Sequence, residues 1–299
     1  MTIESAQFKR LIRFVSSDGN TYFGDAILPE GSIDVYQCKT AFKINGDIFG
    51  DYQLTEEILT VTKLLSPLAA EQVPAIRCVG MNYIKHAIEL KMQIPKYPVV
   101  FFKPTSAIVG PEDPILVPSA CQIHGAKIDY EVEMVIVIGK TGRDIEEKDA
   151  QDYILGYTIG NDVSQRTWQM DRGGTQFGVG KMFDTFAPIG PAIISKHELT
   201  DTSNLRIYSQ VNGEQRQDSN TQDMIFDVNK VVSFMSMGTT LKPGDIIFTG
   251  TPSGVAVGLE HTPYLVDGDE IFFHIDQIGN LKTKVEFEKP NQKILEYYT

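Results

Sequence analysis

The 299-residue sequence has few cysteines and no apolar run long enough to cross a bilayer. Its three cysteines, Cys38, Cys78 and Cys121, are far apart and form no CxxC pair, which argues against a disulfide scaffold or a thiolate zinc site. The N-terminal segment MTIESAQFKRLIRF lacks the apolar core of a signal peptide and the Arg-rich, acid-poor composition of a transit peptide. We therefore expect a cytoplasmic protein that does not bind membranes.

Basic residues are also scarce, because 27 Lys and Arg stand against 39 Asp and Glu, for a formal charge of -12. This balance disfavours nucleic acid or an anionic membrane surface as a partner. It does not exclude a small carboxylate substrate, since a local cluster of Lys and Arg can bind one. The 42% apolar content is typical of a globular protein with a sizeable core.

Two common catalytic motifs are missing. There is no GxSxG nucleophile elbow, so serine hydrolysis lacks support. The glycine-rich segment DRGGTQFGVGKMFDTF (171–186) is not a Walker loop, because Lys181 is followed by Met182 instead of Ser or Thr. A loop that delivers one lysine, Lys181, into a pocket is the alternative interpretation.

Many short strand candidates at irregular intervals, with few helices between them, predict a mixed β-rich (α+β) fold, a β-sandwich or barrel-like roll. We expect helices over 55–65, 86–92, 146–154 and 224–238. The proline-marked connector 66–76 places a boundary near residue 70. The prediction is a small N-terminal α/β domain over 1–70 and a second domain over 71–299.

The segment IDYEVEMVIVIGK (128–140) places three carboxylates on one face of a predicted strand, where alternate side chains point the same way. A solvated edge face is one interpretation. The following apolar run instead indicates burial on both faces, and carboxylates at the mouth of a buried strand suit a hard divalent cation. Asp162 follows a second short apolar strand and is well placed to be a third ligand beside Glu131 and Glu133.

His86 and Glu89 are three positions apart in NYIKHAIELKM, so on a helix they share a face. A carboxylate that fixes the tautomer of a histidine is the usual way to build a general base. A surface ion pair is the simpler alternative.

Taken in order, the segments CVGMNYIKHAIE, VVFFKP, DYEVEMVIVIGK, GNDVSQRTWQ, GKMFDTFAPIGP and LKPGDIIFTGTPSGV closely resemble the fumarylacetoacetate hydrolase family. The resemblance covers roughly residues 75–290 and implies a β-sandwich roll that assembles as a homodimer. It also implies Mg²⁺ or Mn²⁺ bound by Glu131, Glu133 and Asp162, with Asp129 outside the ligand set.

The same resemblance assigns catalytic roles to the dyad His86–Glu89 and to Lys181. It places substrate contacts at Arg166, Gln169 and Thr251, where the Thr251 hydroxyl would donate to a carboxylate. Lys103, in FFKP, is a further candidate cation near the mouth of the site.

A 2-oxo acid or 1,3-dicarbonyl can chelate such a metal, whose Lewis acidity stabilises an enolate. The leading hypothesis is a Mg²⁺-dependent enzyme that cleaves a C–C bond in these compounds, by acylpyruvate-type hydrolysis or oxaloacetate-type decarboxylation. The alternatives are a keto–enol tautomerase or double-bond isomerase of 2-hydroxymuconate-type acids, and a non-catalytic metabolite-binding homologue.

Overall fold

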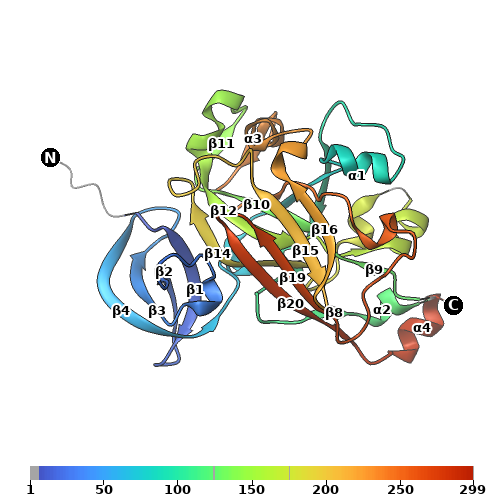
Figure 1. Ribbon diagram of the computed structural model, residues 1–299, viewed down its shortest axis with the longest axis horizontal. Coiled ribbons are helices and arrows are strands. Elements are labelled where there is room, and N and C mark those ends of the chain that lie inside the picture. Colours follow the sequence, from blue (N-terminus) through green and yellow to red (C-terminus); the bar gives the residue numbers. More distant parts are fainter. Residues whose placement is uncertain (1–6, 124, 175, 299) are drawn as a thin grey trace.

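A computed structural model describes residues 7–123, 125–174 and 176–298, and most of its regular structure is β-sheet (Figure 1). The strands of this described part are β1 (Arg10–Ser16), β2 (Thr21–Ile27), β3 (Thr40–Gly46), β4 (Tyr52–Leu64), β5 (Ile76–Gly80), β6 (Val99–Lys103), β7 (Ile108–Val109), β8 (Ile115–Val117), β9 (Ile128–Asp129), β10 (Val132–Ile138), β11 (Gly142–Arg143), β12 (Ile154–Asn161), β13 (Ser164–Gln165), β14 (Ala187–Ser195), β15 (Arg206–Val211), β16 (Glu214–Asn220), β17 (Thr240–Leu241), β18 (Ile246–Phe248), β19 (Glu270–Ile275) and β20 (Gly279–Phe287).

The helices are short and lie between the strands. The α-helices in the described residues are α1 (Ile84–Glu89), α2 (Ser119–Gln122), α3 (Val228–Ser236) and α4 (Gln292–Tyr298). Short 3₁₀ helices are η1 (Val35–Gln37), η2 (Ala70–Gln72), η3 (Thr105–Ala107), η4 (Glu147–Tyr153), η6 (Phe177–Gly180), η7 (Thr221–Asp223) and η8 (Ala256–Gly258), and η5 (Thr167–Arg172) is a π-helical turn. None of these helices is long and apolar enough to span a membrane.

Two sheets enclose the core. The larger runs β2-β3-β4-β1-β14-β12-β10-β18-β5-β6, with β7 paired to β14, and the smaller runs β16-β15-β19-β20-β8. Most pairings are antiparallel, but β18 runs parallel to β5, β20 to β8 and β7 to β14. Apolar side chains of both sheets share one cluster, as Met134 of β10 does with Phe273 of β19. The expectation of a sheet-rich, sandwich-like fold is therefore confirmed.

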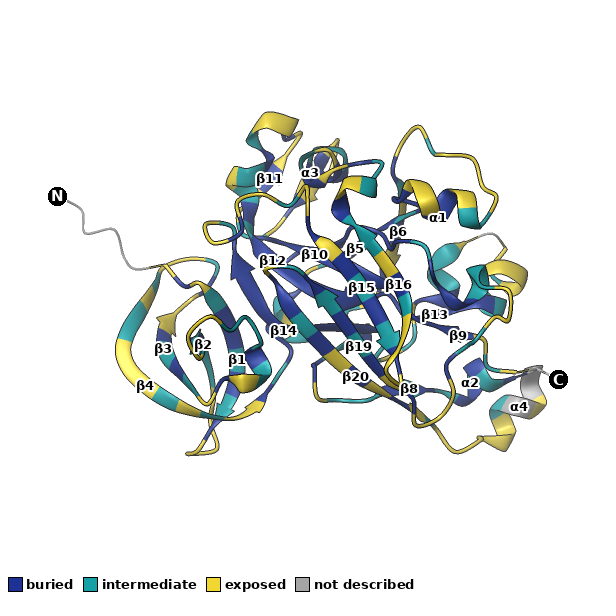
Figure 2. Cartoon of the chain, viewed as in Figure 1, coloured by how far each residue is buried: buried dark blue, intermediate teal, exposed yellow. Residues whose placement is uncertain are grey.

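Strand β10 is buried on both faces, as its uninterrupted apolar sequence predicts. Met134 and Ile136 face the cluster that the two sheets share. Val135 and Val137 face a second cluster with Phe248 on the other side of the larger sheet. Figure 2 shows β10, β12 and β14 buried along most of their length, so the strands that lead to the acidic residues are fixed by packing on each side.

The N-terminal strands β1–β4 close on one another, because β1 pairs with both β2 and β4, and they form the group at the left of Figure 1. The expected helix over 55–65 is wrong, since these residues belong to the long strand β4. Its β-branched residues Ile58, Thr60 and Val61 favour an extended backbone, and pairings such as Leu59 with Ala41 hold it. No α-helix lies within described residues 7–70, so this segment is not α/β.

The other helix expectations fare better. Residues 146–154 contain the 3₁₀ helix η4 and the first residue of β12, and 224–238 contain the shorter α3, whose N-cap Asp227 accepts a hydrogen bond from the Lys230 N–H. Strand β1 also pairs with β14, at Leu11 with Ile193, so the larger sheet runs on from the N-terminal strands. The domain boundary near residue 70 stays a prediction.

Candidate active site

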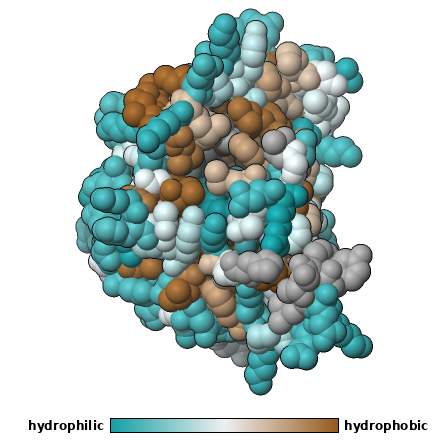
Figure 3. Space-filling view, turned by 90° about the vertical axis from the view of Figure 1, so that its right-hand side faces the viewer, coloured by the Kyte–Doolittle hydropathy of each residue, from teal (hydrophilic) through white to brown (hydrophobic). Residues whose placement is uncertain are grey.

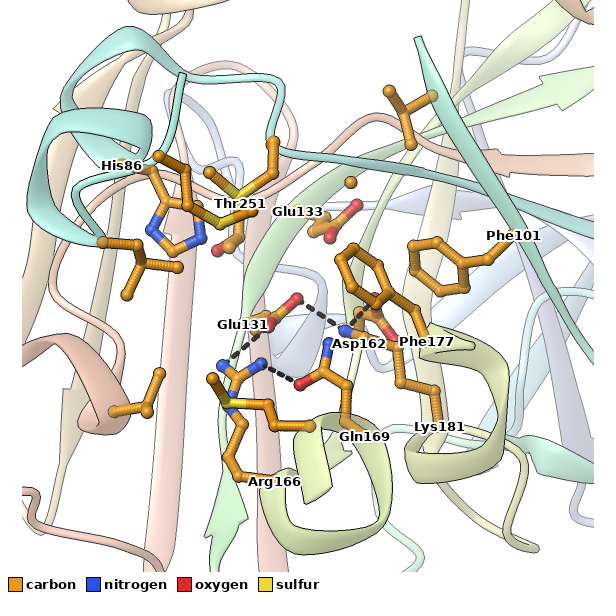
Figure 4. Close-up of a pocket in the computed structure, with 17 residues that line it drawn as sticks. His86, Phe101, Glu131, Glu133, Asp162, Arg166, Gln169, Phe177, Lys181 and Thr251 are labelled. Atoms are coloured by element: carbon orange, nitrogen blue, oxygen red, sulfur yellow. Dashed lines mark hydrogen bonds and ion pairs between the residues drawn. The ribbon is translucent and has the colours of Figure 1, made fainter. Parts of the chain in front are cut away.

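A pocket of about 350 Å³ lies where β10 begins and β12 ends (Figure 4). Its charged lining residues are Glu131, Glu133, Asp162, Arg166 and Lys181, and its apolar lining residues include Met81, Leu90, Met92, Phe101, Phe177 and Val257. The pocket therefore combines a cluster of charges with a largely apolar remainder, the usual composition of a small-molecule site.

The three predicted metal ligands converge because of strand pairing. Val132 of β10 lies opposite Asn161 of β12, so residues 131 and 133 flank the point where Asp162 leaves its strand. One carboxylate oxygen from each of Glu131, Glu133 and Asp162 lies within 4.8 Å of the others, and all three residues are buried. This acidic triad can hold a metal ion.

The strand predicted over 128–140 is not continuous, although its alternating sequence suggested one strand. It breaks between β9 and β10, at Tyr130 and Glu131, and Asp129 lies in β9. The Asp129 carboxylate accepts hydrogen bonds from the backbone N–H groups of Ala256 and Val257, at 2.7 and 3.0 Å. It also pairs with Arg166, at 2.8 Å. Asp129 thus positions Arg166 and the η8 loop, outside the triad as expected.

Two cations of the pocket contact the triad directly. The Lys181 ammonium donates to Glu131 Oε2 at 2.9 Å, to Asp162 Oδ2 at 2.6 Å and to the Ser164 hydroxyl at 2.8 Å. The Arg166 guanidinium lies 2.7 Å from Glu131 Oε1. Lys181 is almost fully buried, so the glycine-rich segment does deliver one lysine into the pocket.

Lys103 does not lie at the mouth of the site. Its ammonium group is buried behind Asp162, where it donates to Asp162 Oδ1 and to the backbone carbonyls of Val163 and Phe186. It is absent from the pocket lining. Lys103 shares the buried face of β6 with the pocket-lining Phe101, but its ammonium group ends behind the Asp162 carboxylate and not at the mouth of the cavity, so the predicted position is wrong.

The charges of this cluster do not balance. Among the described residues, the cluster holds four carboxylates, and three of them, Asp129, Glu131 and Asp162, form ion pairs with the cations Lys103, Arg166 and Lys181. Glu133 forms no ion pair in this set, and it accepts a 2.6 Å hydrogen bond from the Gly250 N–H. A buried carboxylate without a cationic partner is costly. The donor set therefore fits a divalent cation bound by oxygen ligands.

The electrostatics of the two glutamates differ for the same reason. Burial, together with the negative charges of Asp162 and Glu131, raises the pKa of Glu133 well above its ordinary value. Burial also opposes ionisation of Glu131, but the charges of Lys181, Arg166 and His86 outweigh it and lower the pKa of Glu131 to about 2. Glu131 is thus held as a carboxylate, whereas Glu133 is the group that a bound cation would stabilise most.

The turn after β18 requires glycine at position 250. Gly250 has φ +98°, and a Cβ there would lie 2.6 Å from the Asn82 Cβ and 3.0 Å from the Val79 carbonyl oxygen. The absence of a side chain lets the turn approach β5 closely and aim the Gly250 N–H at Glu133. Asn82 fixes the other side of this contact, donating to the carbonyls of Thr249 and Phe226.

The expected dyad forms on α1. His86 Nδ1 lies 3.0 Å from Glu89 Oε2, and Glu89 Oε1 accepts from the Gly254 N–H at 2.8 Å. His86 is buried and lines the pocket with the acidic triad, and its ring faces the cavity in Figure 4. Because Glu89 engages Nδ1, the Nε2 atom is the ring nitrogen left to accept a proton.

Gln169 and Thr251, both expected to touch the substrate, line the same pocket. The π-helical turn η5 places the Gln169 side chain so that its Oε1 accepts from Arg166 Nη1 at 2.8 Å. The Thr251 hydroxyl bonds within the protein, donating to the Val132 carbonyl at 3.0 Å and accepting from Gln217 Nε2 at 2.7 Å. Sequence reasoning missed Gln217, because nothing in EQRQDSN (214–220) points to a partner so distant in the chain.

The pocket opens beside apolar surface. Met92 and Met170 line it and are 49% and 60% exposed, and Ile88 of α1 is 66% exposed. Figure 3 shows hydrophobic side chains gathered in the upper half of the face that lies on the right in Figure 1, the side that carries α1. A ligand that reaches the charges therefore passes an apolar rim.

Comparison with known proteins agrees with this geometry. The family model described as fumarylacetoacetate (FAA) hydrolase, C-terminal, matches residues 75–286. A Xenopus laevis oxaloacetate tautomerase is 43% identical over 222 residues, which is 74% of this chain and 68% of that protein. A Bos taurus oxaloacetate tautomerase is 46% identical over 208 residues, covering 70% of this chain and 65% of that protein.

A solved structure gives the same picture over more of the chain. The crystal structure of 2-hydroxyhepta-2,4-diene-1,7-dioate isomerase from Mycobacterium marinum is 36% identical, with a TM-score of 0.78 over 94% of this chain and 99% of that one. This likeness includes the N-terminal strands as well as the segment that the family model matches.

The expectation of a cytoplasmic protein is contradicted by these relatives. The Xenopus laevis and Bos taurus proteins, and a human one, are all named as mitochondrial. The expectation rested on the composition of the first fourteen residues, on unpaired cysteines and on the lack of an apolar run that could cross a bilayer. Unpaired cysteines and the lack of a membrane span are compatible with more than one compartment, so these features could not decide the question.

The match over residues 75–286 extends through the acidic triad, the dyad on α1 and the turn at Gly250. The relatives and the solved structure named above are enzymes. On this evidence, the chain belongs to the fumarylacetoacetate hydrolase family of enzymes.

Proposed function

We propose that this protein is a divalent-metal-dependent keto–enol tautomerase of small 2-oxo acids, with oxaloacetate as the first substrate to test. The observation that carries the proposal is the position of His86, a buried histidine oriented by Glu89 in the same pocket as the acidic triad. Tautomerisation needs one base that moves a proton at a carbon next to a carbonyl, and one group that stabilises the enolate. The names of the two relatives point to the same reaction.

Glu131, Glu133 and Asp162 would hold the metal, Mg²⁺ or Mn²⁺, because carboxylate oxygens are the preferred ligands of these ions. When bound, the ion would supply Lewis acidity toward the substrate oxygens. The remaining steps fall to side chains. His86 Nε2 would take the proton from the carbon beside the carbonyl, and Glu89 would stabilise the imidazolium that results.

Arg166 and Lys181 would hold the substrate carboxylate and stabilise negative charge on the substrate oxygen. Both are buried in the pocket, where electrostatic attraction is stronger than in water. Their anchors, Asp129 for Arg166 and Ser164 for Lys181, reduce the freedom of each cation before the substrate arrives.

C–C cleavage is the second candidate, by hydrolysis of an acylpyruvate or decarboxylation of oxaloacetate. The dyad supports it, since a histidine paired with a carboxylate can also activate a water. Tautomerisation passes through the enolate of the intact substrate, whereas C–C cleavage releases the enolate of pyruvate. The same metal ion and cations would stabilise either enolate, so the site chemistry alone does not separate the two reactions. The resemblance also implies a homodimer, which light scattering of the purified protein would check.

The test uses purified protein with Mg²⁺ and oxaloacetate added in its enol form. We expect rapid loss of enol absorbance, with pyruvate formed no faster than in buffer. Glu133→Gln should lose this activity together with Mg²⁺ binding measured by calorimetry. Pyruvate release from oxaloacetate, or cleavage of acylpyruvates, would favour the second candidate, and no turnover of any of these acids would contradict both.

A further inference from the structure

Gln217 of β16 connects the smaller sheet to the pocket and is fully buried. Its side-chain oxygen accepts from the Val132 N–H at 3.1 Å and from the Ser209 hydroxyl at 3.0 Å. Its side-chain nitrogen donates to the Pro252 carbonyl at 2.9 Å and to the Thr251 hydroxyl at 2.7 Å. All four hydrogen-bonding positions of this amide are therefore used.

The orientation of the amide follows from backbone groups. The Val132 N–H can only donate, so the Gln217 atom beside it must be the oxygen. The Pro252 carbonyl can only accept, so the atom beside it must be the nitrogen. A flipped amide would place two acceptors together at one end and two donors at the other.

The same reasoning fixes the proton of Thr251. A hydroxyl has one proton to donate and two lone pairs to accept with. Gln217 donates to Thr251 and so occupies one lone pair, while the Val132 carbonyl can only accept and so takes the proton. What Thr251 has left for the pocket, which it lines, is one lone pair.

We propose that Thr251 acts toward the ligand as a hydrogen-bond acceptor, and that it thereby favours an acid that places an O–H group beside it over one that places a carbonyl or carboxylate oxygen there. This reverses the expectation from the sequence, in which Thr251 donates to a carboxylate. In the proposed tautomerase, the enol form carries an O–H that the keto form lacks, so Thr251 would favour the enol.

The inference takes from the proposed function only that the ligand is a small 2-oxo or 2-hydroxy acid. Its test is therefore a binding measurement that needs no turnover. Glycolate offers a hydroxyl donor next to its carboxylate, whereas oxalate offers acceptors at every oxygen. Calorimetry at a fixed Mg²⁺ concentration gives the ratio of the two affinities for each variant, and the difference in charge between the acids cancels when ratios are compared.

Thr251→Val removes the acceptor with little change in volume, and we expect it to weaken glycolate binding about tenfold, the effect of one hydrogen bond, with oxalate binding nearly unchanged. Thr251→Ser keeps the hydroxyl and should keep the wild-type ratio. Should Thr251→Val fail to fold, Thr251→Ala removes the same oxygen and gives the same comparison.

The outcomes separate the two proposals. A variant that loses oxalate affinity as much as glycolate affinity would overturn the inference, because Thr251 would then donate. A wild-type protein that binds neither acid would overturn it as well. A protein that lacks tautomerase activity but shows the expected ratios would contradict the proposed function and leave this inference supported.

Discussion

The ammonium nitrogen of Lys181 lies 2.6 Å from Oδ2 of Asp162. It also lies 2.9 Å from Oε2 of Glu131, so a single lysine contacts two of the three carboxylates in the acidic triad. A metal ion held by the triad would bind carboxylates that this ammonium group also contacts. The lysine and the ion would therefore be like charges that compete for the same carboxylates.

This competition predicts opposite effects of one substitution. Lys181→Met should raise Mg²⁺ affinity about tenfold, because it removes a like charge beside the ion, and should lower turnover by about 10² to 10³. Calorimetry and steady-state kinetics on the same preparation measure both. Lys181→Arg keeps the charge and is the matched control. Weaker Mg²⁺ binding in Lys181→Met would mean that the lysine helps to build the metal site.

The dyad should matter for turnover and not for the metal. His86→Ala is expected to lower kcat/KM by about 10² to 10⁴, the usual contribution of a general base, with Glu89→Gln following in the same direction. Neither residue belongs to the triad, so Mg²⁺ affinity should stay at the wild-type value. Lys85→Ala changes an exposed neighbour on α1 and should leave both quantities unchanged. Equal losses in kinetics and metal affinity would argue for a structural role of α1.

The close approach at Gly250 can be tested by adding a single methyl group. Gly250→Ala should destabilise the fold by roughly 1–3 kcal/mol, because it combines a positive φ with a Cβ 2.6 Å from Asn82. Denaturant unfolding measures the free energy, and calorimetry should show weaker Mg²⁺ binding as the N–H moves away from Glu133. Gly213→Ala separates the two causes, since Gly213 also has a positive φ, at +79°, but open space around it. If both substitutions lowered the free energy of unfolding equally, the close contact with Asn82 would add nothing to the cost of the positive φ.

Asp25 predicts a pH dependence outside the site. Burial raises the pKa of this carboxyl, although the N–H groups of Arg10 and Lys9 oppose the shift. Between the ordinary aspartate value of about 4 and the raised one, the folded chain holds a proton that the unfolded chain has released, so stability falls as pH rises. Asp25→Asn keeps an oxygen for both N–H groups, which bond to Oδ1, and should flatten this slope.

Denaturant unfolding from pH 4 to pH 7 measures the effect of Asp25→Asn. The exposed Glu30→Gln is the control and should keep the wild-type slope. A wild-type protein whose stability does not fall over the lower part of this range would show that Asp25 is better solvated than its position indicates.

The sequence predicted those parts of the site whose residues lie in one segment or in a strong motif. Glu131 and Glu133 lie in one strand segment, and His86 and Glu89 in one helical turn, so local geometry already relates their side chains. Lys103 was misplaced because its position behind Asp162 depends on where β6 joins the sheet, which no local pattern contains. Gln217 was missed for a related reason, since its partner Val132 lies in β10 and its partner Thr251 in the turn after β18.

The helix expected over 55–65 shows the same limit at the level of the fold. The opening Thr and Glu residues, and the spacing of Ile58, Leu59, Val61 and Leu65, satisfy a helix pattern as well as a strand pattern. The pairing of β4 with β3 and β1 decides between them, and both partners precede it in the chain. Tertiary contact thus overrides a local preference of marginal strength.

The parallel pairing of β18 with β5, at Phe248 and Cys78, affects when the site can form during synthesis of the chain. It ties the segment just before Thr251 to the one just before His86, so the candidate catalytic and substrate-binding groups meet only after most of the chain has been synthesised. A nascent chain that stops short of β18 carries the glutamates and the histidine without the turn that holds Glu133 in place. A chain released from the ribosome before β18 is made would therefore have no activity at all, and not merely a reduced activity.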